Sequence, residues 1–191
     1  MYLGQEYKIA GNWFIIHFTE NNGMAFGLEL FGKKFLSIFR IVVAIGLGWY
    51  LKSLVTTKAH PVFITAMSMI FAGAIGNILD SIFYGKIFTA SEFQVATFLS
   101  PEGGYESWLH GKVVDMFYFP IIETHYPQWF PIWGGEDFVF FRPVFNVADS
   151  SISLGVFIII LFQSAIFKKE TVVEVNSSDN VSQIKGTEQA G

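Results

Sequence analysis

The sequence predicts an α-helical membrane protein with three transmembrane helices, a small extracytoplasmic sheet and a long extracytoplasmic loop. Its composition is the first reason. Of the 191 residues, 52% are hydrophobic and only 15% are charged, and the mean hydropathy of +0.45 is unusual for a soluble domain. The second reason is that three apolar stretches come close to the roughly 20 residues that a helix needs to cross a bilayer.

The three stretches differ in how cleanly they end. The second contains no charge before Asp80, and its Gly73 and Gly76 form a small-residue face suited to close helix packing. The third is ended by Lys168 and Lys169. The predicted spans are residues 35–54, 61–79 and 144–167.

Basic residues set the predicted orientation. Lys52 and Lys58 flank the short loop between the first two spans, and two lysines follow the third, so these sites are predicted to be cytoplasmic. Residues 1–34 and 80–143 are then extracytoplasmic, and residues 168–191 form a polar cytoplasmic tail without fixed structure. No hydrophobic segment precedes residues 1–34 to carry them across, so we expect a first span to be missing from this chain.

Two extracytoplasmic segments have the pattern of strands. Residues 13–20, W-F-I-I-H-F-T-E, alternate apolar and polar side chains, and N-N-G at 21–23 favours a tight turn before residues 24–30. This pattern predicts a hairpin or small sheet. Residues 137–141, D-F-V-F-F, are also β-prone.

Several functions are excluded or disfavoured by composition. The chain has no cysteine, which excludes disulfides, thiolate metal sites and thiol catalysis. Its four histidines lack metal-binding spacing, so we expect neither metal nor cofactor. The net charge of -4 predicts no nucleic-acid partner.

Three carboxylates, Asp80, Asp115 and Asp149, are predicted to lie at the outer membrane boundary. Ionisable groups at membrane depth are costly and invite a functional hypothesis. Two carboxylates that meet share a proton, so one can act as a base and the other as an acid, as in aspartic proteases. Asn77 and Asn146 each precede an aspartate by three residues, which places them on the same helix face.

Each residue also has a structural interpretation. Asn146 can be a helix N-cap with Asp149 at the third helical position. Asp80 can be a solvated interface residue, and Asp115 can end a short apolar strand. The acids would then belong to a noncatalytic membrane scaffold or, as intramembrane acids, to a fragment of a proton-coupled transporter.

Four segments, in this order along the chain, together resemble the bacterial lipoprotein signal peptidases, also called signal peptidase II. They are N-N-G-M-A-F-G at 21–27, G-A-I-G-N-I-L-D at 73–80, V-V-D-M at 113–116 and F-N-V-A-D-S at 145–150. The resemblance implies a multi-pass aspartyl endopeptidase of the bacterial cytoplasmic membrane. The family has four spans, an extracytoplasmic β cradle and a cover over its site at the extracytoplasmic face.

Carried over by motif, the resemblance makes Asp115 and Asp149 the catalytic pair. It also implies a set of residues that shape the site or bind substrate: Asn21, Gly23, Asn77, Asp80, Asn146 and Ala148. The implied substrate is a prolipoprotein cut just before a cysteine that carries diacylglycerol, and the implied inhibitor is globomycin. Membrane lipids are the other expected partners, no metal or cofactor is required, and we expect a monomer.

The chain departs from the family pattern at three places. It has no first span with a D-Q-x-x-K motif. Ser81 follows Asp80 where many members have arginine. Segments 86–111 and 117–144 are insertions relative to short members, and their aromatic content predicts that they enlarge the cover over the site.

Overall fold

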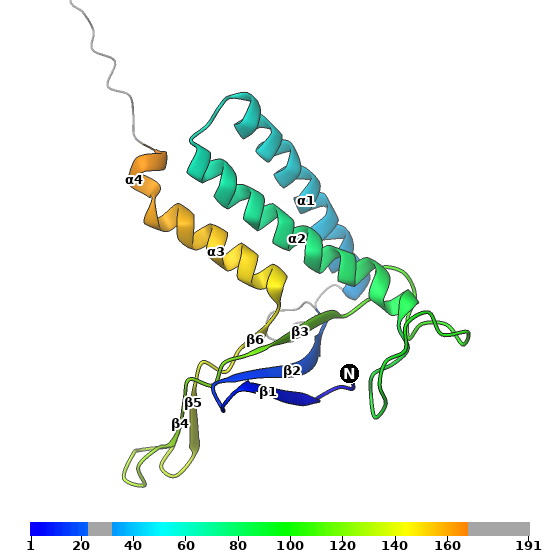
Figure 1. Ribbon diagram of the computed structural model, residues 1–191, viewed down its shortest axis with the longest axis vertical. Helices are drawn as coiled ribbons and strands as arrows, with labels where there is room; N and C mark the ends of the chain where they lie inside the picture. Colours follow the sequence, from blue (N-terminus) through cyan, green and yellow to red (C-terminus); the bar gives the residue numbers. More distant parts are fainter. Residues whose placement is uncertain (23–31, 168–191) are drawn as a thin grey trace, which may run out of the picture.

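The computed structural model describes residues 1–22 and 32–167 (Figure 1). Helices gather at one end and strands at the other. In chain order the elements are β1 (Glu6–Ala10), β2 (Phe14–Asn21), α1 (Lys33–Thr56), α2 (Pro61–Ile87), β3 (Val113–Tyr118), β4 (Ile122–His125), β5 (Asp137–Phe140), β6 (Val144–Phe145), α3 (Val147–Leu161) and α4 (Gln163–Ile166).

Within these described residues, α1 and α2 are the two helices long and apolar enough to cross a membrane. The start of α2 follows from its sequence, because Pro61 occupies the first turn and the side chain of His60 accepts a hydrogen bond from the backbone nitrogen of Val62 at 3.3 Å. Large apolar side chains such as Ile45 and Trp49 of α1 are exposed, as expected for surfaces that face lipid.

Helix α2 continues to Ile87, well beyond the predicted end at residue 79. Asp80 therefore lies inside the helix, two turns before its end, and the helix extends beyond the span predicted at 61–79. The physical reason is that one aspartate does not stop a helix, and Ile82 and Phe83 continue the apolar sequence. Lys86 in the last turn is also favourable to the helix dipole.

The predicted single helix over residues 144–167 is not observed. Val144 and Phe145 form the short strand β6, and Asn146 caps α3. Helix α3 is apolar but has 15 residues, fewer than the roughly 20 of a full span, and Phe162 separates it from α4. Apolar composition alone could not distinguish a buried strand from the first turn of a helix.

Helix α3 packs against the small-residue face of α2. A Cβ added to Gly73 would clash with the carbonyl oxygen of Ala148, and one added to Gly76 would lie 3.1 Å from the Cβ of Ala148. Further along, a Cβ on Gly155 would lie 2.6 Å from the carbonyl oxygen of Ala66. The predicted close packing at Gly73 and Gly76 is confirmed, and it brings the start of α3 against the middle of α2.

The four-stranded sheet is antiparallel with the order β1-β2-β3-β6. The predicted strand at residues 13–20 is confirmed as β2, but it pairs with β1, which the sequence analysis did not anticipate. The predicted turn at Gly23 and the second arm at 24–30 lie outside the described residues. Asp115 pairs with Thr19, so both side chains are on the same face of the sheet.

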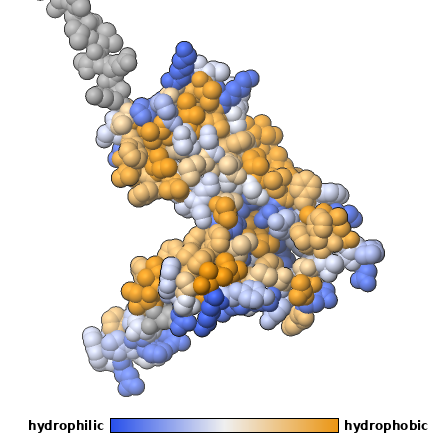
Figure 2. Space-filling model, viewed as in Figure 1, coloured by the Kyte–Doolittle hydropathy of each residue, from blue (hydrophilic) through white to orange (hydrophobic). Residues whose placement is uncertain are grey.

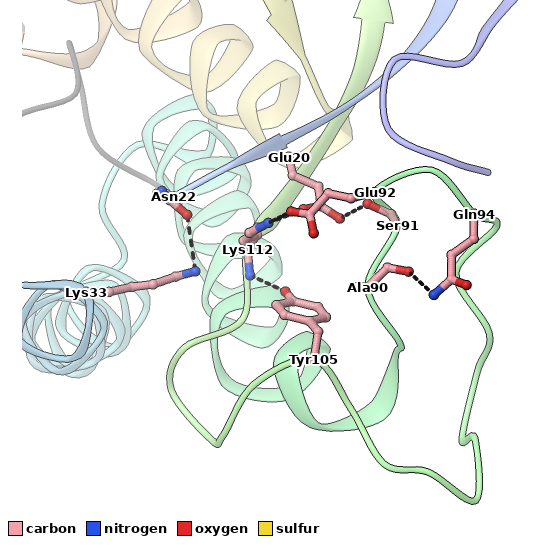
Figure 3. A network of polar contacts seen from close by, with 9 residues as sticks. All are labelled: Glu20, Asn22, Lys33, Ala90, Ser91, Glu92, Gln94, Tyr105 and Lys112. Carbon is pink, nitrogen blue, oxygen red and sulfur yellow. Dashed lines mark hydrogen bonds and ion pairs between the residues drawn. The ribbon is translucent and has the colours of Figure 1, made fainter.

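The first insertion, residues 86–111, packs beside the sheet and is held there by a polar network (Figure 3). The Lys112 ammonium lies 2.6 Å from Glu20 Oε2 and 3.4 Å from Glu92 Oε1. Ser91 donates to the other Glu20 oxygen at 2.5 Å, and the Lys112 backbone nitrogen donates to the Tyr105 hydroxyl at 2.6 Å. The insertion is thus tied to β2, the strand that carries Asn21.

The second insertion contains a separate hairpin of β4 and β5. The strand predicted from D-F-V-F-F is confirmed as β5. Figure 1 shows the hairpin extending from the sheet, away from α1 and α2. None of the residues that line the pocket described below comes from this hairpin, and the prediction that the insertions enlarge the cover over the site stays a prediction.

Candidate active site

The candidate site lies where β3, α2 and the start of α3 meet, and Asn146 is at its centre. The Asn146 side chain accepts a hydrogen bond from the backbone nitrogen of Asp149 at 2.9 Å. In return, the Asp149 carboxylate accepts from the backbone nitrogen of Asn146 at 3.4 Å. This reciprocal pair is a capping box, so the predicted capping roles of both residues are confirmed.

The same Asn146 side chain also contacts the other acid. Its amide nitrogen lies 2.9 Å from Asp115 Oδ1, 3.1 Å from Asn77 Oδ1 and 3.3 Å from the carbonyl oxygen of Val114. Because this nitrogen carries two hydrogens and faces three acceptors, at least one hydrogen is shared. Asn146 is only 6% exposed, so these bonds hold its side chain in one orientation.

Asn77 completes a connection between the two acids. Its amide nitrogen donates to Asp149 Oδ1 at 2.8 Å, while its oxygen accepts from Asn146. The Asn146 side-chain amide therefore binds Asp115, the Asn77 side-chain amide binds Asp149, and the two amides bind each other. Among the described residues, no buried side-chain nitrogen or oxygen lacks a hydrogen-bond partner, and such fully satisfied networks hold their members rigidly.

Asp115 is the most buried of the three acids, at 3% exposure. Asn21 donates to its Oδ2 at 3.2 Å. Burial raises the pKa of Asp115 to about 6, and the negative charges of Asp149 and Asp80 also raise it, while the hydrogen bonds from Asn21 and Asn146 lower it. A carboxyl with this pKa can hold or release a proton near neutral pH.

Asp80 lies one turn beyond Asn77 on α2. Its Oδ2 is 3.5 Å from the backbone nitrogen of Val114, so it contacts the strand next to Asp115. Ser81, which stands where many family members have arginine, is buried and donates to the carbonyl oxygen of Asn77 at 2.9 Å. Its hydroxyl is thus used within the helix.

A pocket of about 370 Å³ opens beside these residues. Asn77, Asp80 and Asn146 are the polar residues of the network that line it, and Asp149 and Asp115 are hydrogen-bonded to Asn77 and Asn146. The rest of the wall is mainly small or apolar. The lining residues are Ala72, Gly73, Gly76, Asn77, Asp80, Tyr84, Val114, Met116, Asn146, Val147, Ala148 and Ser151.

The structure brings together almost all the site residues expected from the sequence. Asn21, Asn77, Asp80, Asp115, Asn146, Ala148 and Asp149 lie around one junction, and Gly23 lies outside the described residues. The sequence analysis missed Tyr84, which lines the pocket and hydrogen-bonds Asp80. Its i+4 spacing from Asp80 would have indicated it had the helix been extended past residue 79.

In the described part of the chain, no group of three His, Cys, Asp or Glu side chains is placed to hold a metal ion. Carboxyl groups oriented by amides, as at this junction, can transfer protons.

Comparison with known proteins gives a consistent result. The family model described as signal peptidase (SPase) II matches residues 1–165. A lipoprotein signal peptidase of Porphyromonas gingivalis is 56% identical over 163 residues, which cover 84% of this chain and 71% of the relative. One from Amoebophilus asiaticus is 38% identical over 167 residues, covering 85% of this chain and 66% of the relative.

The fold is also similar to a solved structure, described as a bacterial membrane enzyme determined by the in meso method at 2.3 Å resolution. That chain has 25% sequence identity and a TM-score of 0.54. The match covers 91% of this chain and 80% of the other.

Proposed function

Because this chain belongs to the signal peptidase II family, we propose that Asp115 and Asp149 are the catalytic pair with which it works. The chain is an aspartic-type peptidase that acts as a lipoprotein signal peptidase. The observation that carries the assignment of the pair is the amide network between them. Asn146 binds Asp115 through its side chain and Asp149 through its backbone nitrogen, and Asn77 binds Asp149 and Asn146. The transporter and scaffold alternatives are not favoured.

The environments of the two acids support different roles. Asp115 is buried on a strand, and its raised pKa favours the protonated form. Asp149 lies in the first turn of α3, where the positive end of the helix dipole favours a carboxylate. Asp115 is therefore the general acid, and Asp149 is the general base.

The proposed reaction is hydrolysis of one peptide bond. Asp149 takes a proton from water as its oxygen attacks the carbonyl carbon, and Asp115 gives its proton to the carbonyl oxygen. When the intermediate collapses, the carbon–nitrogen bond breaks, Asp149 protonates the leaving nitrogen, and Asp115 regains a proton from a hydroxyl group. Asn77 and Asn146 keep the acids in position, and Asp80, Asn21, Gly23 and Ala148 shape the site.

The substrate is a prolipoprotein cut before its diacylglyceryl-cysteine. The apolar wall of the pocket and the exposed apolar helices support this, since both suit a substrate presented from lipid. The site lies at the extracytoplasmic face of the cytoplasmic membrane, as supported by Lys52 near the end of α1 and Lys58 in the connection from α1 to α2. The enzyme acts as a monomer. Helices α3 and α4 together form the third span, and the four-stranded sheet is the family's β cradle.

Substitution of each acid tests the pair. Asp115→Asn and Asp149→Asn should each lower processing of a lipidated prolipoprotein by at least about 100-fold, because general acid and base groups contribute at this scale. Asp137→Asn is the matched control, since Asp137 is an exposed carboxylate on β5. Processing is followed by the shift of the substrate on a gel, and folding by thermal unfolding in detergent. Full processing by either site variant would remove the residue from the mechanism.

A further inference from the structure

The loop that joins β4 to β5 exposes large aromatic and aliphatic side chains. Trp129 is 80% exposed and Ile132 is 85% exposed, and Trp133 is also exposed. Together with Tyr126 and Phe130 they form a group that we call the hairpin tip. Single exposed apolar residues are ordinary on protein surfaces, but three exposed ones packed with two half-buried rings at the end of a projecting hairpin require a reason.

The rings of the hairpin tip are packed against one another. Phe130 lies 5.2 Å from Tyr126, 6.0 Å from Trp129 and 6.1 Å from Trp133, measured between ring centroids. The carbonyl oxygen of Tyr126 also accepts a hydrogen bond from Gly135 at 3.0 Å, which closes the loop. The tip is therefore a preformed surface that presents Trp129 and Ile132 outward.

Ile132 has an unusual backbone conformation and an unusual exposure for an isoleucine. Its φ of 77° lies in the left-handed region, which a β-branched residue rarely adopts. Its side chain is also almost fully exposed. Transfer of that side chain from water into an apolar medium would be favourable through the hydrophobic effect.

The position of the hairpin indicates which medium that is. In Figure 1 the hairpin leaves the sheet across the direction of α2 and does not continue along it. Because α2 is a helix that can cross the membrane, a hairpin at this angle to it would extend along the membrane boundary. Figure 2 shows a hollow, open on one side, between the helices and the sheet. The hairpin extends on this open side.

Aromatic rings continue from the base of the hairpin onto the sheet. Phe141 lies 6.0 Å from Phe145, Phe145 lies 5.7 Å from Phe119, and Phe119 lies 6.4 Å from Trp13. Phe145 also contacts Phe117, two residues along β3 from Asp115. The aromatic surface thus runs from the neighbourhood of the candidate site out to the hairpin.

The lack of basic residues in the loop of the hairpin favours a lipid interface over an acidic partner. Residues 126–136 contain no lysine or arginine, and the only charged residue among them is Glu136. Attraction to anionic headgroups or to an acidic protein would need cations. Tryptophan and tyrosine, by contrast, concentrate at membrane–water interfaces because their rings are apolar with one polar group.

We propose that the β4–β5 hairpin is an interfacial anchor, whose tip enters the headgroup region of the same bilayer that α1 and α2 cross. The anchor sets the height of the sheet, and hence of β3, relative to the lipid. This role goes beyond peptide cleavage and does not depend on which residues are catalytic.

The absence of cysteine allows a direct test. A single spin label is attached to the Ile132→Cys variant, and its collision rates with oxygen and with a water-soluble nickel chelate are measured in phosphatidylcholine vesicles. Glu102→Cys is the control, because Glu102 is an exposed residue of the other insertion. The label at position 132 should be several-fold more protected from nickel than the label at 102. Equal access to nickel at the two positions would overturn the proposal.

Two further measurements separate lipid from other partners. Adding phosphatidylglycerol to the vesicles should leave the protection at position 132 unchanged, whereas protection that appears only with anionic lipid would contradict an aromatic anchor. The double variant Trp129→Ser, Ile132→Ser should raise the KM for lipidated substrate several-fold in vesicles and leave it unchanged in detergent. A rise of the same size in detergent would place the tip on the substrate protein and would also overturn the proposal.

Discussion

Asn146 caps the N-terminus of α3, and its side-chain amide donates a hydrogen bond of 2.9 Å to Asp115. One side chain therefore fixes the start of the helix that carries Asp149 and also contacts the acid on the neighbouring strand. Local helix stability and the geometry of the candidate site depend on the same group. The two contributions can be separated by substitution.

Replacement of Asn146 should distinguish the cap from the site. Asn146→Ala removes both the cap of α3 and the hydrogen bond to Asp115. It should lower the free energy of unfolding by about 1–2 kcal/mol, the usual loss for an N-cap. Asn146→Ser restores a good cap but is too short to maintain the contact with Asp115. Thermal unfolding should therefore recover in the serine variant while processing stays low in both. Recovery of processing with serine would mean that Asn146 acts through the cap alone.

Stability should depend on pH through Asp115. Its pKa in the folded protein, about 6, is above the ordinary value of 3.8, so the folded state binds this proton more tightly than the unfolded state. The resulting stabilisation is complete below about pH 4 and is lost as pH rises through about 6. Thermal unfolding of wild type and Asp115→Asn between pH 4 and 8 tests this. The variant should lack that part of the pH dependence, whatever its absolute stability, and an unchanged slope would contradict the assignment.

Close packing of α2 against α3 should make Gly73 intolerant of a larger side chain. In Gly73→Ala the added methyl group would clash with the carbonyl oxygen of Ala148, so α3 must shift at the turn that carries Asp149. Overpacking of this kind typically costs about 1–3 kcal/mol. We expect a lower unfolding temperature together with reduced processing.

Gly46→Ala is the matched control, because a Cβ there meets nothing within 4 Å. Alanine favours helix over glycine by up to about 1 kcal/mol, so this variant should be as stable as wild type or slightly more stable. Equal losses at positions 46 and 73 would show that the effect is unrelated to α3.

The Glu20–Lys112 ion pair should contribute strongly to stability, because the Glu20 side chain is only 8% exposed. Removal of one partner of a buried pair costs about 3–5 kcal/mol, since the other charge is left uncompensated. Glu20→Gln and Lys112→Met should each be destabilising, and the double variant should lose less than the sum of the two. Additive losses in this double-mutant cycle would mean that the two side chains are not coupled.

Exposed ion pairs provide the control. His125 and Asp137 lie 2.6 Å apart on the hairpin, and both side chains are about three-quarters exposed at 75% and 74%. Such pairs contribute roughly 0–1 kcal/mol. Asp137→Asn should therefore unfold at nearly the wild-type temperature, in contrast to the Glu20 variant.

The sequence by itself determined the features that depend on local chemistry. Apolar length and flanking charge predicted helices at α1 and α2. Alternation predicted β2, the β-prone residues at 137–141 predicted β5, and the spacing of Asn146 and Asp149 predicted the cap. The motifs around Asp115 and Asp149 also indicated the family. These features depend on residues within a few positions of one another, or on a family pattern.

Only the tertiary structure decided how distant segments meet. The pairing of Thr19 with Asp115 sets which face of β3 carries the acid, and the contact of Gly73 with Ala148 sets where α3 begins relative to Asn77. The course of residues 144–167, predicted as one helix, changed because β6 pairs with β3 before the chain turns into α3. Strand pairing and helix contacts are long-range interactions, and the free energy of an apolar segment alone does not specify its partner.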